Sequence, residues 1–140
     1  GVYPVSAVLA DDSIMSVFNP GDHGSTFGGN PLASAVAEVS LEVLKEEDLA
    51  GNALDMGSYF IEGLKMLKSP IVKEIRGKGL LIGVEIKKDY GTARPFCEKL
   101  MDLGILCKET HQQTIRFAPP LIINQKEIDW ALERIAVILK

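Results

Sequence analysis

Residues 22–31 read DHGSTFGGNP, and this stretch sets the organisation of the chain around it. It joins three glycines to two adjacent hydroxyl side chains, Ser25 and Thr26, and it ends in Asn30-Pro31. Asn is a strong helix N-cap, and Pro is favoured at the first helical position because the N–H that it lacks would have no partner there. Apolar residues then recur at helical spacing from Leu32 onward. The stretch therefore predicts a loop that leads into a helix over residues 31–45.

Such a junction between a loop and a helix favours anions. Free backbone N–H groups, the positive end of the helix dipole and the hydroxyl donors all attract negative charge. The stretch has neither the Gly-Lys-Ser/Thr ending of a Walker loop nor the spacing of a dinucleotide-binding GxGxxG motif. From spacing alone, an ordinary glycine-rich turn with a good helix cap is the stronger interpretation.

The composition is that of an ordinary globular protein. The chain has 140 residues, 46% of them hydrophobic and 24% charged, which suits one domain or one domain with an arm. The net charge is −4 and the basic residues are spread among acids, which argues against a nucleic-acid or membrane partner. No apolar run reaches the length of a membrane span and no signal peptide opens the chain, so a cytoplasmic location is expected.

The two cysteines, Cys97 and Cys107, suit a reducing compartment. No further Cys or His stands at ligand spacing, so no metal site is predicted. A disulfide between them stays open, but nothing in the sequence favours it. His23 and His111 have no nucleophile context, and His23 is expected to order the loop by hydrogen bonding.

The remaining elements follow from the hydrophobic periods. A buried strand is predicted over residues 2–10, and a helix over 53–67 in which Gly57 and Gly63 disturb the regularity. Small residues on all sides of the helix 31–45 predict that it packs closely against other elements. Strands over 71–76 and 80–87 form a hairpin about Gly77-Lys78-Gly79. A helix over 94–103, strands over 105–108 and 114–118, and a last helix with a capping box at Asn124 complete the pattern. The order ββαββα predicts an α+β fold, a small antiparallel sheet with helices on one face.

Four motifs, in this order, resemble the C-terminal part of class III pyridoxal-phosphate aminotransferases. They are YPVSAV at 3–8, HGSTFGGNPLA at 23–33, RGKGL at 76–80 and IRFAPP at 115–120. The loop motif is shared across the class, whereas RGKGL and RFAPPL are most similar to the members that use ornithine. The resemblance implies the small C-terminal domain of a fold-type-I aminotransferase plus the end of the large domain. Residues 1–30 would end the large domain, 31–50 would form a connecting helix, and 51–140 would form the small α+β domain.

The resemblance also implies roles for three residues. Ser25 and Thr26 would bind the phosphate of pyridoxal 5'-phosphate held by the neighbouring subunit of a homodimer. In the predicted strand 114–118, Ile115 and Phe117 face one side and Arg116 the other. A guanidinium can clamp a carboxylate through two parallel hydrogen bonds. The resemblance implies that Arg116 faces the active site, where it recognises a substrate carboxylate or pairs with a Glu until a dicarboxylate arrives. The alternatives are hydroxyls that only satisfy the turn, and a surface arginine on an edge strand.

No catalytic residue is expected within the chain. A pyridoxal-phosphate transaminase needs a lysine that forms a Schiff base. In the family this lysine stands shortly before the position that matches Gly1, and no lysine of this chain matches it. The resemblance therefore implies an inactive piece of an enzyme that transfers the δ-amino group of ornithine to 2-oxoglutarate. The alternatives are a piece of an acetylornithine-using or other class III enzyme, and a non-catalytic dimerisation module.

Overall fold

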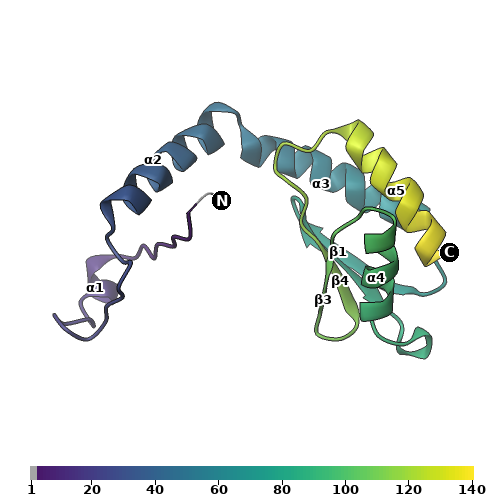
Figure 1. The fold of residues 1–140 in the computed structure, drawn as a ribbon, viewed down its shortest axis with the longest axis horizontal. Helices are drawn as coiled ribbons and strands as arrows, with labels where there is room; N and C mark the ends of the chain where they lie inside the picture. The colour runs from purple at the N-terminus through teal and green to yellow at the C-terminus, as the bar shows by residue number, and fades with distance from the viewer. Residues whose placement is uncertain (1–2) are drawn as a thin grey trace. The chain divides into compact units, whose positions relative to one another are not determined.

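The computed structural model describes residues 3–140, and the chain forms two compact units, Gly1–Glu47 and Asp48–Lys140 (Figure 1). The first unit contains the short helix α1 (Asp12–Met15) and the long helix α2 (Pro31–Glu46). The predicted start of α2 is confirmed. Pro31 is its first residue, and the Asn30 side chain accepts a hydrogen bond from the Ala33 N–H at 3.1 Å.

The strand predicted over residues 2–10 is wrong for its described part, residues 3–10, which have no regular structure; Val2 lies outside the described residues. Val8 and Leu9 are 82% and 90% exposed. A strand depends on hydrogen bonds to a neighbouring strand, and the sheet of the described chain is formed by four strands that all lie between residues 72 and 117. A run of valines raises strand propensity, but it does not supply that partner.

The close packing predicted for the helix 31–45 is also wrong. Ala33 is its one buried residue, and Leu32, Val39 and Leu41 are each more than half exposed. Within the described part of the first unit, the other helix, α1, makes no extensive contact with α2. Small side chains permit close packing, but they do not by themselves provide the element that packs.

The second unit carries the sheet, and the predicted order ββαββα is confirmed. Its strands are arranged β1-β2-β4-β3, and every neighbouring pair is antiparallel. The elements, in chain order, are α3 (Leu49–Met66), β1 (Val72–Lys78), β2 (Leu81–Ile86), the 3-10 helix η1 (Lys88–Tyr90), α4 (Arg94–Asp102), β3 (Lys108–Thr110), β4 (Thr114–Phe117) and α5 (Gln125–Leu139).

Several boundaries differ from the prediction. Strand β1 continues to Lys78 and β2 begins at Leu81, so the hairpin turn lies at Gly79-Leu80 instead of Gly77-Lys78-Gly79. Helix α3 begins at Leu49, because Asp48 acts as its N-cap and accepts a hydrogen bond from the Gly51 N–H at 3.3 Å. Strand β3 begins at Lys108 instead of residue 105. Gly104, with φ at +86°, and Ile105 still close the end of α4, since the Ile105 N–H donates to the Leu100 carbonyl at 2.9 Å.

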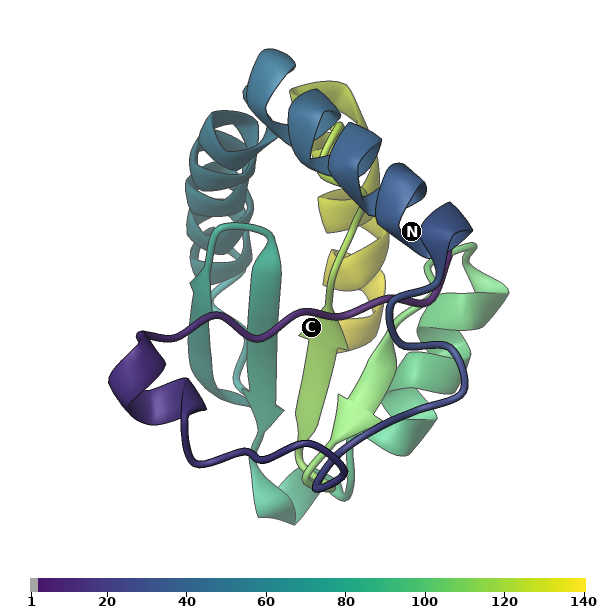
Figure 2. The same cartoon turned by 90° about the vertical axis from the view of Figure 1, so that its left-hand side faces the viewer.

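The core lies between the sheet and helices α3, α4 and α5, which all cover the same face (Figure 2). Strand β2 alternates between its two faces, since Ile82, Val84 and Ile86 are at most 1% exposed while Leu81 is 61% exposed. Ile115 and Phe117 of β4 are buried on the same side. Burying one such side chain contributes about 1.5–3 kcal/mol. The inward residues thus fix the sheet on its helices and leave the other face open.

Candidate functional site

The open face of the sheet carries three basic side chains in one row. Arg76 of β1 pairs with Gly83 of β2, Gly83 pairs with Arg116 of β4, and Arg116 pairs with Lys108 of β3. Residues directly opposite one another in a sheet share a face. Arg116 is exposed between the buried Ile115 and Phe117, the alternation that the sequence predicts.

Arg76 is neutralised by nearby carboxylates. Its guanidinium lies 2.9 Å from Glu85 and 3.0 Å from Glu74, and Lys73 lies 2.6 Å from the other oxygen of Glu85. The hydrogen bond from Lys73, followed by that from Arg76, lowers the pKa of Glu85. Glu85 is therefore ionised at neutral pH and is held on the β1 side of the sheet.

On the opposite edge, Arg94 engages two further carboxylates. Its side chain lies 2.7 Å from Glu98 and 3.0 Å from Glu109. The pKa of Glu109 is lowered, first by a hydrogen bond from the backbone N–H of Glu109 itself and then by the hydrogen bond from Arg94. Hydrogen bonds to Glu98 and Glu109 in turn raise the pKa of Arg94. These two networks account for the ion pairs of residues 3–140, and neither Arg116 nor Lys108 belongs to one.

Arg116 and Lys108 instead line one shallow hollow. It has a volume of about 270 Å³, and the other lining residues are Leu106, Cys107 and Ala118. Leu106 is 85% exposed and places an apolar side chain beside the two cations. A planar guanidinium beside an ammonium group suits a carboxylate or another small anion.

The glycine-rich loop lies in the first unit. The Ser25 hydroxyl accepts a hydrogen bond from the Gly28 N–H at 2.8 Å, so its own hydrogen stays available to donate. Thr26 is exposed beside it, immediately ahead of the capped N-terminus of α2. The hydrogen bonding predicted for His23 is replaced by a contact with Phe18, with ring centroids 6.3 Å apart. The loop thus gathers neutral donors at the start of a helix, as a phosphate group requires.

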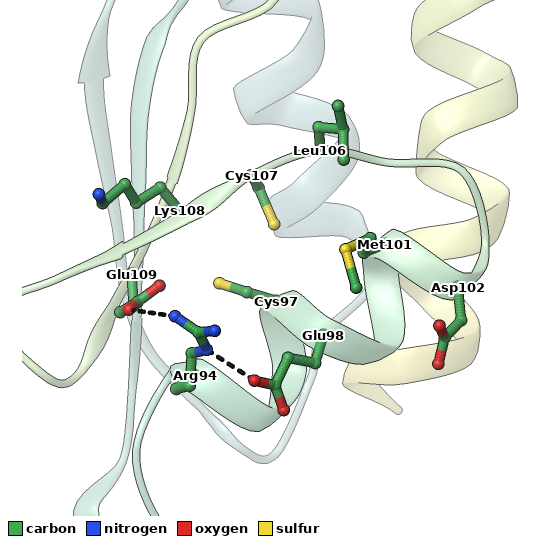
Figure 3. Close-up of a pocket in the computed structure, with 9 residues that line it drawn as sticks. All are labelled: Arg94, Cys97, Glu98, Met101, Asp102, Leu106, Cys107, Lys108 and Glu109. Atoms are coloured by element: carbon green, nitrogen blue, oxygen red, sulfur yellow. Dashed lines mark hydrogen bonds and ion pairs between the residues drawn. The ribbon is translucent and has the colours of Figure 1, made fainter.

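A second hollow, of about 460 Å³, lies between α4 and the segment that leads into β3 (Figure 3). The Cys97 and Cys107 side chains both point into it, and both are free thiols. Burial raises the pKa of Cys97, and it raises the pKa of Cys107 to about 12. Neutral thiols are poor nucleophiles and poor metal ligands. Within residues 3–140 no cluster of three or more metal-binding side chains is found, so this hollow offers little chemistry.

The comparison with known families decides what the chain is related to. The sequence model described as "Aminotransferase class-III" matches residues 1–139. The chain belongs to the class III aminotransferase family. The matched range includes the glycine-rich loop, the hairpin and Arg116. The resemblance drawn from the four motifs is confirmed.

Curated members of the class III family match the chain closely over part of their length. Ornithine aminotransferase of Brevibacillus brevis is 58% identical over 99% of this chain, which covers 34% of that protein. Ornithine aminotransferase of Bacillus subtilis is 56% identical over 100% of this chain, again with 34% of its own length covered. The chain thus spans about a third of the length of the curated relatives that it matches.

Solved structures of class III enzymes share the fold. Ornithine aminotransferase of Plasmodium yoelii gives a TM-score of 0.90 at 44% identity, with 99% of this chain and 37% of that chain covered. Acetylornithine aminotransferase of Elizabethkingia anophelis gives a TM-score of 0.86 at 41% identity, with the same two shares covered. The predicted α+β fold is confirmed. In the described residues, moreover, no helix has both the length and the hydrophobicity needed to cross a membrane.

Ser25, Thr26 and Arg116 remain the site residues predicted from the sequence, and the surroundings of Arg116 were not predicted. Lys108 and the Glu85 network have no local sequence signal, because strand pairing places them. Gly83, inside an otherwise apolar strand, is the one available hint, since a glycine there often marks a place where something approaches closely.

Proposed function

We propose that the chain is the C-terminal part of a pyridoxal-phosphate-dependent aminotransferase that transfers the δ-amino group of ornithine to 2-oxoglutarate. The products would be glutamate semialdehyde and glutamate. The observation that carries this proposal is the 56–58% identity to ornithine aminotransferases over almost the whole chain. We expect the chain alone to be inactive and the parent to be a cytoplasmic homodimer.

The three parts of the chain would have different tasks in the parent. Residues 1–30 would end the large domain, 31–50 would form the connecting helix, and 51–140 would form the small domain. Bound pyridoxal phosphate would supply the electron sink for transamination. Ser25 and Thr26 would hold its phosphate across the dimer, and the free hydroxyl hydrogen of Ser25 and the exposed Thr26 support that role.

Arg116 would recognise a carboxylate of the substrate. Its exposure on the open face and the absence of an ion pair to it within residues 3–140 support this role, because a guanidinium already paired would have to be released first. A hydrogen-bonded pair that involves a charge contributes about 1.5–3 kcal/mol, enough to change affinity by roughly tenfold to a hundredfold.

The second candidate is an acetylornithine aminotransferase. The 41% identity and TM-score of 0.86 to the Elizabethkingia anophelis enzyme favour it as the alternative. The amino donor separates the two. The visible absorbance of the cofactor in the full-length protein should change on addition of ornithine, and N-acetylornithine should leave it unchanged. The opposite pattern would establish the alternative, and a protein that binds no pyridoxal phosphate would contradict both.

The role of Arg116 is tested by Arg116→Lys in the full-length enzyme. Lysine keeps the charge but lacks the planar fork, so we expect the KM for 2-oxoglutarate to rise about tenfold or more. Steady-state kinetics measures this. Arg134→Lys is the matched control, because Arg134 lies over the Trp130 ring on α5 and away from the hollow. An unchanged KM in Arg116→Lys would refute the assignment.

A further inference from the structure

We propose that Lys108 is a second carboxylate-recognition residue beside Arg116, acting on the same carboxylate of a dicarboxylic 2-oxo acid. This inference rests on the proposed function, since it deepens the role given there to Arg116. It is supported by the strand register, by the placement of the nearby carboxylates and by the hollow that the two cations share.

Strand register brings the two side chains together. Lys108 and Arg116 are direct partners in the antiparallel pair β3–β4. Side chains directly opposite in such a pair start about 4.5–5.5 Å apart, and both of these are long enough to converge on one small group. On the other side, the direct partner of Arg116 is Gly83, which has no side chain. Lys108 is therefore the only residue opposite Arg116 whose side chain can share a ligand with it.

The nearby carboxylates are all engaged elsewhere. Glu85 stands diagonally from Arg116 on the same face, but Lys73 and Arg76 hold it at 2.6 Å and 2.9 Å. Glu109 follows Lys108 in sequence, but it pairs with Arg94 at 3.0 Å on α4. Like charges directly opposite in a sheet destabilise it. Within residues 3–140 no carboxylate pairs with Arg116 or Lys108, and two such adjacent cations are expected where an anion binds.

The hollow suits a small ligand. It has a volume of about 270 Å³. Leu106 and Ala118 are uncharged, so Arg116 and Lys108 carry the charge of its lining. The planar guanidinium of Arg116 can donate two parallel hydrogen bonds to a carboxylate, and the ammonium of Lys108 can donate a further hydrogen bond to the same group. The competing interpretation is that Lys108 only protects an edge strand against pairing with other chains.

The experiment compares Lys108→Met, Lys108→Arg and Lys99→Met in the full-length enzyme. Lys99 is exposed on α4 and does not line the hollow, so it controls for loss of a surface charge. For Lys108→Met we expect the KM for 2-oxoglutarate to rise about tenfold, in line with one lost charged hydrogen bond. We expect kcat and the rate of the half-reaction with the amino donor to stay within about twofold, because the lost interaction is made to the oxo acid.

Lys108→Arg should restore the KM to within about twofold of the parent, and Lys99→Met should not change it. A KM within twofold of the parent in Lys108→Met overturns the inference. So does an equal loss in both half-reactions, which would indicate a structural role. If Lys108→Met fails to fold, Lys108→Gln gives the same reading. Arg116→Lys, run in parallel, separates two failures. A raised KM in Arg116→Lys together with an unchanged KM in Lys108→Met refutes only this inference. An unchanged KM in both variants also refutes the role proposed for Arg116, while the loss of ornithine-dependent activity in the parent itself would refute the proposed function.

Discussion

Ser25 and Thr26 are neighbours in sequence, yet their hydroxyls have different surroundings. Ser25 accepts a hydrogen bond from Gly28 and so shapes the loop, while Thr26 is exposed and makes no such bond in the described chain. Removing Ser25 would therefore mix two effects, a distorted loop and a lost phosphate donor. Thr26 is the cleaner test of the phosphate site.

We expect Thr26→Ala in the full-length enzyme to weaken the binding of pyridoxal phosphate about tenfold or more, because one hydrogen bond to a charged group is lost. Titration of the cofactor-free protein, followed by absorbance, measures this. Ser40→Ala is the matched control, since the Ser40 hydroxyl only donates to the Val36 carbonyl within α2. An affinity equal to that of the parent would count against the loop as a phosphate site.

The surroundings of a single residue could be predicted where they depend on neighbours in the sequence, and could not be predicted where they depend on another strand. The alternation of Ile115, Arg116 and Phe117 shows in the sequence which side chain leaves the core, because strand side chains alternate strictly. The partnership of Arg116 with Lys108 does not, because it depends on which residue of β3 lies opposite. Register is a property of two strands, so no single stretch of sequence contains it.

Among the elements, helix α3 contains two glycines whose presence is explained by close packing against neighbouring elements. Gly57 and Gly63 were expected to disturb the helix, yet α3 is continuous from Leu49 to Met66. A Cβ on Gly57 would overlap the backbone carbonyl of Gly79 in the hairpin turn, and one on Gly63 would overlap the Leu132 side chain of α5. The two glycines are therefore the points at which neighbouring elements touch the helix.

We expect Gly57→Ala to lower the free energy of unfolding by roughly 1–3 kcal/mol, because the backbone of the turn cannot move aside cheaply. Gly63→Ala should cost less, since the Leu132 side chain can rotate away. Urea unfolding followed by circular dichroism compares both with the parent. A stabilised Gly57→Ala would mean that the usual helical gain of alanine over glycine outweighs the overlap, contrary to the packing described.

The elements that were predicted well are those with a long internal period. The β1–β2 hairpin, α4 and the capped α5 follow from patterns within their own residues. The strand over residues 2–10 and the close packing of α2 were wrong, because both depend on partners that the sequence pattern does not reveal. The start of β3 was three residues early because Gly104 and Ile105 are used to end α4.

At the scale of the whole molecule, the two units differ in how much they bury. The core cluster, from Phe60 to Leu139, lies entirely within residues 48–140. Ala33 is the only buried hydrophobic residue described in the first unit. Because burial of apolar surface dominates stability, the second unit should account for nearly all the folding free energy of the chain.

We therefore expect residues 48–140, produced alone, to unfold cooperatively in urea at nearly the same midpoint as the complete chain. Residues 3–30, which are exposed and contain only the one-turn helix α1, should be cut first in limited proteolysis of the 140-residue chain, since exposed segments with little regular structure are the preferred sites. Circular dichroism and mass spectrometry of the fragments provide the two measurements. A gradual transition without a midpoint in residues 48–140 would show that the first unit is required for the fold.

The surroundings of the two free thiols in the hollow beside α4 affect how readily they react. Oxidants and alkylating agents react with the thiolate, and the high pKa of Cys107, about 12, leaves almost none of it at neutral pH. Cys97 is buried as well, with its pKa also raised. At neutral pH both thiols are therefore expected to stay in the neutral form and to react slowly with electrophiles.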